Sequence, residues 1–365
     1  MTLNEENVLD ALRTVIDPDL GRDLVSLNMI EDIAINGKKV SFTVNLTTPA
    51  CPMKEEIRDA CIKAITHLVD KEAVVKPEMS SRVTGGRTSG QGDENLLKEV
   101  KNIVAVASGK GGVGKSTVSV NLAVALAQTG ARVGLVDTDI YGPSIPTMFD
   151  IHDRPDITVN RKLVPLEKYG VKLLSMGFLI SQDEAVVWRG PMVSSAVKQF
   201  LSETDWGELD YLILDLPPGT GDIQLTIVQS VPLTGAIIVS TPQVVALDDA
   251  RKGVAMFGKV NVPVLGIIEN MAYFSPPDLP DRKYHIFGKD GAKNLAEKMG
   301  VAFLGEIPIE EQLREGGDSG KPIVVENPKA ASSIAITALA KRTAQQIAIR
   351  NATGEPTKKV EILYR

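Results

Sequence analysis

Beyond about residue 100, the chain alternates short, uninterrupted apolar runs with longer segments that carry apolar residues at helical spacing. Strands without polar alternation are buried on both faces, as parallel strands covered by helices are. We therefore expect an α/β fold, with a mostly parallel sheet and helices on both of its faces. The expected strands cover residues 103–107, 132–136, 171–176, 211–214, 236–239 and 264–268, and the expected helices cover 118–126 and 191–201.

The first 79 residues have a different pattern, with shorter amphipathic segments. Residues 40–46 alternate apolar and polar side chains, which predicts a strand with one buried face. The segments on either side carry apolar residues at helical spacing. The first expected helix places Val8, Leu12, Val15 and Ile16 on one face, and the second places Ile57, Cys61, Ile65 and Leu68. We predict a small α+β domain over residues 1–79.

A polar stretch separates these two regions. Residues 80–95 are rich in Ser, Gly, Thr and charged residues and contain almost no large apolar side chain, which is the composition of a flexible linker. The predicted organisation is therefore a small domain (1–79), a linker (80–98), a larger domain (99–350) and a C-terminal tail (351–365).

A glycine-rich loop follows the first strand of the larger domain. Residues 109–116 fit G-x-x-x-x-G-K-[ST] at every fixed position, with an apolar strand before them and a helix after them. In that setting, backbone N–H groups and the positive end of the helix dipole bind phosphate. Lys115 would reach the β- and γ-phosphates of a nucleotide, and the Ser116 hydroxyl would bind Mg²⁺. The expected phosphate-binding residues are Gly109, Lys110, Gly111, Gly112, Val113, Gly114, Lys115, Ser116 and Thr117.

Acidic residues follow two further expected strands. Asp137 and Asp139 come directly after residues 132–136, and Asp215 comes directly after residues 211–214. Ligands of parallel α/β sheets bind beyond the carboxyl ends of the strands. Carboxylates there can hold a Mg²⁺ shell and orient the water that attacks a γ-phosphate. Asp215 also leads into the glycine-containing run 216–222, which suits a segment that responds to the γ-phosphate.

Composition and charge narrow the class of protein. The 365 residues are 43% hydrophobic and 24% charged, with a formal net charge of −6, so we expect no general attraction to nucleic acid or anionic membranes. No apolar run reaches 18 residues and the acidic start lacks the pattern of a signal peptide. With only two cysteines, a disulfide framework is not expected. We expect a cytoplasmic protein.

The two cysteines lie in different surroundings. Cys61 falls on an apolar helical stripe, which favours a place in the core. Cys51 lies in a loop before the second helix, and Pro52 suits the first helical position. A thiol at a helix N-terminus has its thiolate stabilised by the dipole, which suits metal binding or exchange chemistry. A small residue that fills a tight loop is the other interpretation, and the sequence leaves both open.

Several motifs together resemble one family. The two loop lysines, Lys110 and Lys115, resemble the deviant Walker A motif of the MinD, ParA and nitrogenase iron protein class of P-loop NTPases. The runs SGKGGVGKST, VDTDIYGPSIP, LDLPPGTGD and IIENMAYF resemble the Mrp/ApbC branch, the iron–sulfur cluster carrier ATPases. The runs DPDLGRDLVSLNMI and TTPACP resemble a small SufT-like domain. The resemblance implies an ATP-binding and ATP-hydrolysing iron–sulfur carrier that forms a nucleotide-dependent homodimer.

The resemblance also implies roles for individual residues. Lys110 would reach across the dimer to the partner's nucleotide. Asp139 would position the attacking water, and Asp215 would lie near Mg²⁺. With Lys115, these are the expected catalytic residues, and Ser116, Asp137 and Asp215 are the expected Mg²⁺ shell.

The resemblance places the base of the nucleotide near two later segments. Asn270 would read the adenine, although a turn residue is the alternative. Pro308 and the glycine-containing loop 316–320 fall where the family closes around the base, although that loop could equally be a plain connection. ATP and Mg²⁺ are the expected cofactors.

The expected cluster ligands are missing. The family usually carries a C-x-x-C pair shortly after its MAYF-like segment, whereas residues 275–280 here read SPPDLP and residues 62–365 contain no cysteine. Cluster binding therefore leaves Cys51 as the candidate thiolate ligand, supplied once by each of two protomers, with other ligands or a partner to complete the shell. The expected partners are a second copy and iron–sulfur donors or apo-protein clients, without nucleic acid or membrane. A MinD/ParA-like regulator, a kinase or ligase on the same fold, and a nucleotide-gated scaffold that binds no cluster are the alternatives.

Overall fold

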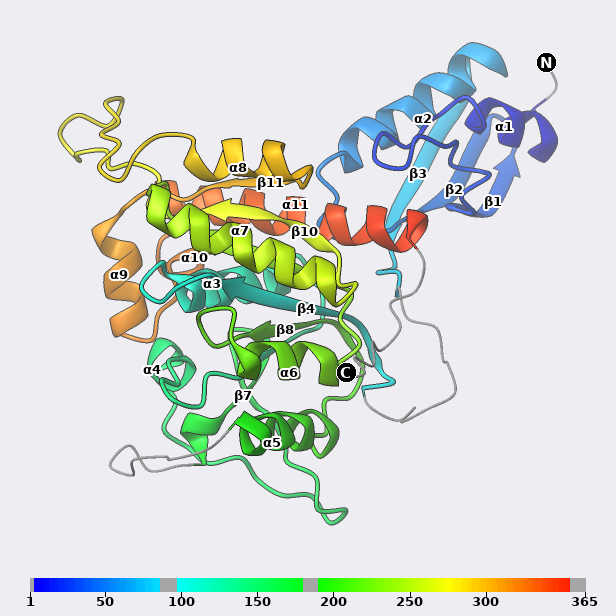
Figure 1. Ribbon diagram of the computed structural model, residues 1–365. Helices are drawn as coiled ribbons and strands as arrows, with labels where there is room; N and C mark the ends of the chain where they lie inside the picture. The colour runs from blue at the N-terminus through cyan, green and yellow to red at the C-terminus, as the bar shows by residue number, and fades with distance from the viewer. Residues whose placement is uncertain (1–2, 86–96, 180–189, 355–365) are drawn as a thin grey trace. The chain divides into compact units, whose positions relative to one another are not determined.

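The computed structural model describes residues 3–85, 97–179 and 190–354 (Figure 1). The chain forms two compact units. Among the described residues, the first comprises residues 3–84 together with Ala348–Gly354, and the second comprises residue 85 and residues 97–179 and 190–347. Most of the predicted linker falls outside the described residues, so the predicted flexibility stays a prediction.

In its described part, the first unit contains a three-stranded sheet and two helices before residue 84. The strands are β1 (Ile30–Asn36), β2 (Lys39–Leu46) and β3 (Val74–Ser81), in the order β1-β2-β3. β1 pairs with β2 antiparallel and β3 pairs with β2 parallel. The helices are α1 (Glu5–Leu12) and α2 (Lys54–Leu68). The alternation along β2 is confirmed, since Val40, Phe42, Val44 and Leu46 are all buried.

The last position of each predicted helical stripe, Ile16 and Leu68, is exposed instead of buried. α1 stops at Leu12 because the N–H groups of residues 14 and 15 turn back to the carbonyls of residues 11 and 12. Val15 is still buried, but Ile16 is 53% exposed. Leu68, the last residue of α2, is 50% exposed, and Val69 beyond it takes the buried place. The remaining predicted core positions of both helices, including Cys61, are confirmed.

The second unit is built on an eight-stranded sheet within the described residues. Its order is β11-β10-β9-β4-β8-β5-β7-β6, and every neighbouring pair is parallel except β6 and β7. Each predicted strand is present, and the short β6 and β11 were not expected. The strands are β4 (Val100–Ser108), β5 (Val133–Asp137), β6 (Leu166–Lys168), β7 (Val171–Ser175), β8 (Leu209–Asp215), β9 (Gly235–Ser240), β10 (Val264–Glu269) and β11 (Phe303–Glu306).

Helices cover both faces of this sheet (Figure 1). In β4, Ile103, Ala105 and Ala107 share one core with side chains of α5 to α8. Because successive strand residues point to opposite faces, Val104 and Val106 face the other side of the sheet. The helices and the 3-10 turn η1 are α3 (Lys115–Gln128), α4 (Ile145–Phe149), η1 (Met176–Phe178), α5 (Gly190–Ser202), α6 (Asp222–Ser230), α7 (Val244–Lys259), α8 (Gly291–Met299), α9 (Glu311–Asp318), α10 (Ile323–Glu326) and α11 (Ala331–Thr353).

The predicted loop 316–320 is partly wrong, since its first residues form the last turn of α9. Glycine is required at position 316, because a Cβ there would lie 2.4 Å from the carbonyl oxygen of Lys321. Among the described helices, none is long and apolar enough to cross a membrane.

Candidate functional site

The glycine-rich loop joins the end of β4 to the start of α3. Ser108, the last residue of β4, donates its hydroxyl to the carbonyl oxygen of Lys110 at 3.0 Å. α3 begins at Lys115, and no side chain caps its first N–H groups. Gly112 and Gly114 have φ values of +79° and +80°, which turn the backbone into a left-handed arrangement that favours glycine. The start of α3 is therefore available to an anion, as the motif predicted.

Two of the loop glycines are required by packing as well. A Cβ on Gly109 would lie 2.2 Å from the backbone carbonyl carbon of Asp249 in α7. A Cβ on Gly114 would lie 2.2 Å from Nδ2 of Asn270. Gly111 and Gly112 face open space instead. α7 and Asn270 thus hold the loop closely at Gly109 and Gly114, whereas no described atom lies within 4 Å of a Cβ at Gly111 or Gly112.

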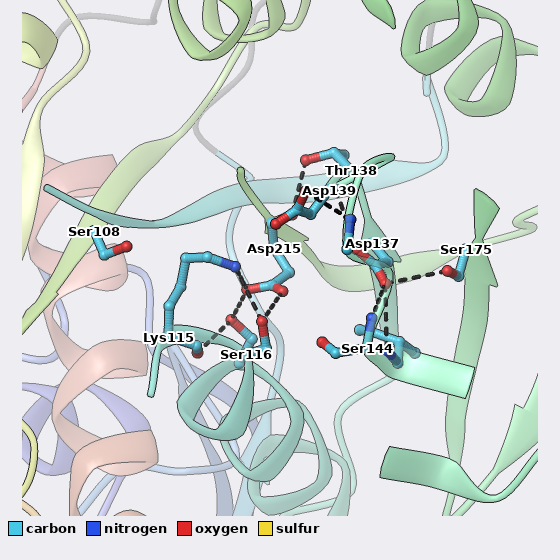
Figure 2. Close-up of polar contacts among 12 residues, drawn as sticks. Ser108, Lys115, Ser116, Asp137, Thr138, Asp139, Ser144, Ser175 and Asp215 are labelled. Atoms are coloured by element: carbon cyan, nitrogen blue, oxygen red, sulfur yellow. Dashed lines mark hydrogen bonds and ion pairs between the residues drawn. The ribbon is translucent and has the colours of Figure 1, made fainter. Parts of the chain in front are cut away.

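Asp215, at the end of β8, is the centre of the site (Figure 2). Its Oδ1 lies 2.7 Å from Lys115 Nζ and accepts a hydrogen bond from Ser119 Oγ at 2.6 Å. Its Oδ2 accepts a hydrogen bond from Ser116 Oγ at 2.6 Å. Asp215 is fully buried and Lys115 is 6% exposed. The lysine and hydroxyl of the loop therefore already converge on one carboxylate.

Asp137 lies beside Asp215, because the two end residues of β5 and β8 pair in register. One oxygen, Oδ2, accepts hydrogen bonds from the N–H groups of Ser144 and Ile145 at 3.0 and 3.2 Å and from Ser175 Oγ at 3.1 Å. Burial, and then the negative charge of Asp215, raise the pKa of Asp137 to about 7. Two buried carboxylates therefore share one buried ammonium group, that of Lys115.

This arrangement fits a divalent cation that arrives with a nucleotide. The touching Ser116 hydroxyl and Asp215 carboxylate are the oxygen ligands that Mg²⁺ prefers, with phosphate oxygens and waters to complete its shell. Among the described residues, no group of three or more His, Cys, Asp or Glu side chains could hold a metal by itself. Both oxygens of Asp137 already accept hydrogen bonds from the protein, so its predicted place in the Mg²⁺ shell stays a prediction.

The other two expected catalytic residues are Asp139, after β5, and Lys110, within the loop. Asp139 is half-buried after β5, and burial raises the pKa of its carboxyl. Its Oδ1 accepts a 3.3 Å hydrogen bond from the N–H of Gly142. Lys110 is also half-buried, and within the described ranges no acceptor lies within hydrogen-bonding or ion-pairing distance of its ammonium group. The predicted roles of both residues stay predictions.

Asn270 follows β10 and contacts the glycine loop directly. It is 4% exposed, and its Nδ2 donates to the carbonyl oxygen of Val113 at 2.9 Å. The loop itself therefore fixes the orientation of the Asn270 amide group. A residue that only forms a turn would not need such a contact. Pro308 is buried beyond β11, where the N–H of Ile307 donates to the carbonyl oxygen of Glu269 at 2.8 Å. Contact with a base stays a prediction for Asn270 and for Pro308.

Sequence reasoning missed three hydroxyl groups of the site. Thr138 donates to the carbonyl oxygen of Asp215 at 2.7 Å, and Ser175 and Ser119 donate to Asp137 and Asp215. A signal for Ser119 was present, because it is a polar residue in an apolar helix, four residues after Lys115 and three after Ser116. Residues three and four apart lie on one helix face.

The cysteines lie apart from this site, in the first unit. Cys61 is buried, and burial raises its pKa to about 12. Cys51 is half-buried against the core of that unit. α2 begins only at Lys54, and burial raises the pKa of the Cys51 thiol. Burial therefore opposes the stabilised thiolate, one of the two interpretations left open, and favours a residue that fills a tight loop. The role of Cys51 as a cluster ligand stays a prediction.

Two family models together match most of the residues of both units. The model of a family described as NUBPL iron-transfer P-loop NTPase matches residues 99–344. A second model, described as iron–sulfur cluster assembly protein, matches residues 5–76.

Individual relatives and solved structures agree with these matches. An iron–sulfur cluster carrier protein of Synechocystis sp. is 52% identical over 95% of this chain and 99% of its own length. An iron–sulfur cluster transfer protein of Dictyostelium discoideum is 52% identical over 70% of this chain and 79% of its own. A nucleotide-binding protein of Archaeoglobus fulgidus, solved with ADP, is 39% identical with a TM-score of 0.57, covering 65% of this chain and 92% of that one. The cell-division ATPase MinD of Pyrococcus furiosus is 25% identical with a TM-score of 0.52, covering 66% of this chain and 97% of that one.

Proposed function

The chain belongs to the family of NUBPL iron-transfer P-loop NTPases, and on that premise we propose that it is an iron–sulfur cluster carrier or assembly factor that binds and hydrolyses ATP. The observation that carries this proposal is the convergence of Lys115 and Ser116 on Asp215 at the start of α3. The relatives named as cluster carriers support an iron–sulfur cluster as the cargo, because the similarity to one of them extends over 95% of the chain.

The residues of the site have the properties that phosphoryl transfer to water requires. Such transfer depends on positioning and on neutralising phosphate charge more than on covalent chemistry. Lys115 and the uncapped N-terminus of α3 would neutralise the phosphates, and Asp139 would orient the attacking water. Mg²⁺, held by Ser116 and Asp215, would add positive charge at the phosphates. We propose that turnover is slow, because Asp215 now holds Lys115 in a buried ion pair that nucleotide must replace.

We also propose that nucleotide joins two copies of the chain. Lys110 supports this, since its ammonium group has no acceptor among the described residues of its own chain. The iron–sulfur cluster would be held between two copies of the chain, or between one copy and a client protein. Cys51 is the candidate thiolate ligand. Because residues 62–365 contain no cysteine, a nucleotide-gated scaffold that docks another carrier is the second candidate. We place the protein in the cytoplasm, with iron–sulfur donors or apo-proteins as partners and without nucleic acid or membrane.

Phosphate release from ATP by the purified protein tests the enzymatic part of the proposal. We expect slow, Mg²⁺-dependent release by the wild type and none above background by Lys115→Ala. Equal release by both proteins would refute the assignment of the site. ATP-dependent pelleting with anionic liposomes, or binding to plasmid DNA, would instead indicate a MinD- or ParA-like regulator.

A further inference from the structure

Ser119 is a third side-chain donor to Asp215 that no motif assigns. Its Oγ lies 2.6 Å from Asp215 Oδ1 and 3.1 Å from the carbonyl oxygen of Lys115, one turn earlier in α3. A hydroxyl has one proton to donate. The short contact to a buried carboxylate is the stronger of the two, because hydrogen bonds to charged acceptors are shorter and stronger than those to carbonyl groups. Ser119 is fully buried, so water does not compete for this proton.

The other two donors to Asp215 have a second task. Lys115 is needed at the phosphates and Ser116 at the metal, and both bonds to Asp215 must change when nucleotide binds. Asp215 has no exposed surface, and a buried carboxylate oxygen without a donor is costly. Ser119 lies one turn further into α3 than Lys115 and is fully buried, away from the helix start to which the motif assigns phosphate binding. It is therefore the side-chain donor that can stay on Asp215 throughout.

We propose that Ser119 is a positioning residue, which holds the Asp215 carboxylate in the orientation that binds magnesium when Lys115 turns to the nucleotide. This inference rests on the proposed function of the loop as a nucleotide site. Groups that orient a metal ligand typically change metal affinity by about 10- to 100-fold when they are removed. Ser119→Ala removes one oxygen atom and keeps a residue of high helix propensity, so the fold of α3 is expected to persist.

The test compares ADP binding with and without magnesium. Isothermal titration calorimetry on the nucleotide-free full-length chain gives the Kd of ADP once in Mg²⁺ and once in EDTA, and the ratio of the two is the enhancement by magnesium. We expect Ser119→Ala to lower this enhancement about 10-fold, which is the low end of the range for groups that orient a metal ligand. The Kd of ADP in EDTA should stay unchanged. Ser119→Thr, which keeps the hydroxyl, should recover most of it. Ser333→Ala, a buried serine of α11, is the matched control.

Each outcome has a defined meaning. An enhancement in Ser119→Ala equal to that of the wild type and of Ser333→Ala would overturn the proposal. Equal weakening of ADP binding in Mg²⁺ and in EDTA would also overturn it, because that pattern indicates a structural role. A wild-type chain that binds no ADP in either buffer would refute the proposed function instead.

Discussion

Asp137→Asn is expected to stabilise the nucleotide-free protein above neutral pH. The pKa of Asp137 is raised from 3.8 to about 7, first by burial and then by the charge of Asp215. A carboxyl group with a raised folded-state pKa binds more protons in the folded chain than in the unfolded chain between those two values. Its contribution to stability is therefore present below about pH 4 and is lost as the pH rises through about 7.

The size of the effect follows from the same shift. One pKa unit corresponds to about 1.4 kcal/mol, so the full shift from 3.8 to about 7 sets an upper limit of about 4 kcal/mol. Asparagine keeps an oxygen for the N–H groups of Ser144 and Ile145, but it loses the hydrogen bond that Asp139 N–H now donates to Oδ1. One lost hydrogen bond costs about 1 kcal/mol. Subtracting this cost from the upper limit leaves a net gain of up to about 3 kcal/mol at pH 8, and little or none at pH 4.5.

Urea unfolding in EDTA, followed by tryptophan fluorescence, measures this gain. Both tryptophans of the chain, Trp188 and Trp206, follow residue 99 in the sequence, and Trp206 is buried in the core of the second unit. A change in its emission therefore reports on the unit that contains the site. The free energy of unfolding would be compared between Asp137→Asn and the wild type at pH 4.5 and at pH 8. A variant that is less stable than the wild type at pH 8, or a difference that does not change with pH, would refute the reasoning.

Three further substitutions test the loop and its surroundings. Lys115→Ala leaves Asp215 buried without its cation, so we expect the free energy of unfolding in urea to fall by about 3 kcal/mol. ATP turnover should be lost as well. Unchanged stability would contradict the buried ion pair. Gly114→Ala meets Asn270 Nδ2 and a φ of +80°, which we expect to cost about 1–3 kcal/mol and to weaken ADP binding in calorimetry, whereas wild-type values would contradict the packing argument. Lys110→Ala should bind ADP normally but stay monomeric with ATP in light scattering, and a dimer would refute the role of Lys110 across the interface.

The strands that carry the site could be predicted from sequence because they are buried on both faces. Their apolar runs are uninterrupted, and the functional residues follow directly where each run ends. β6, by contrast, is three residues long and half exposed, so its residues carry no comparable pattern. Ile16 and Leu68 were wrongly expected to be buried, because the turns at the ends of the two helices depend on backbone hydrogen bonds that periodicity does not report.

The contacts among site residues were less predictable than the residues themselves. The motif identified Lys115, Ser116 and Asp215, but their convergence depends on the distance between the start of α3 and the end of β8. Gly109 was expected to admit phosphate, whereas the structure shows that α7 also excludes any side chain there. The sequence left open whether Cys51 is an activated thiol or a small residue that fills a tight loop, and its burial opposes the activated thiol. Burial and long-range distance are tertiary properties, and a local pattern does not encode them.

The central claim is that this ATP site serves an iron–sulfur cargo, and the cargo can be measured directly. Iron and acid-labile sulfide would be determined per chain after anaerobic purification, with absorption spectra recorded with and without ATP. We predict bound iron and sulfide on the wild type, lost in Cys51→Ala and retained in the matched variant Cys61→Ala. Wild-type protein without iron or sulfide after anaerobic reconstitution, or an unchanged cluster in Cys51→Ala, would contradict the account.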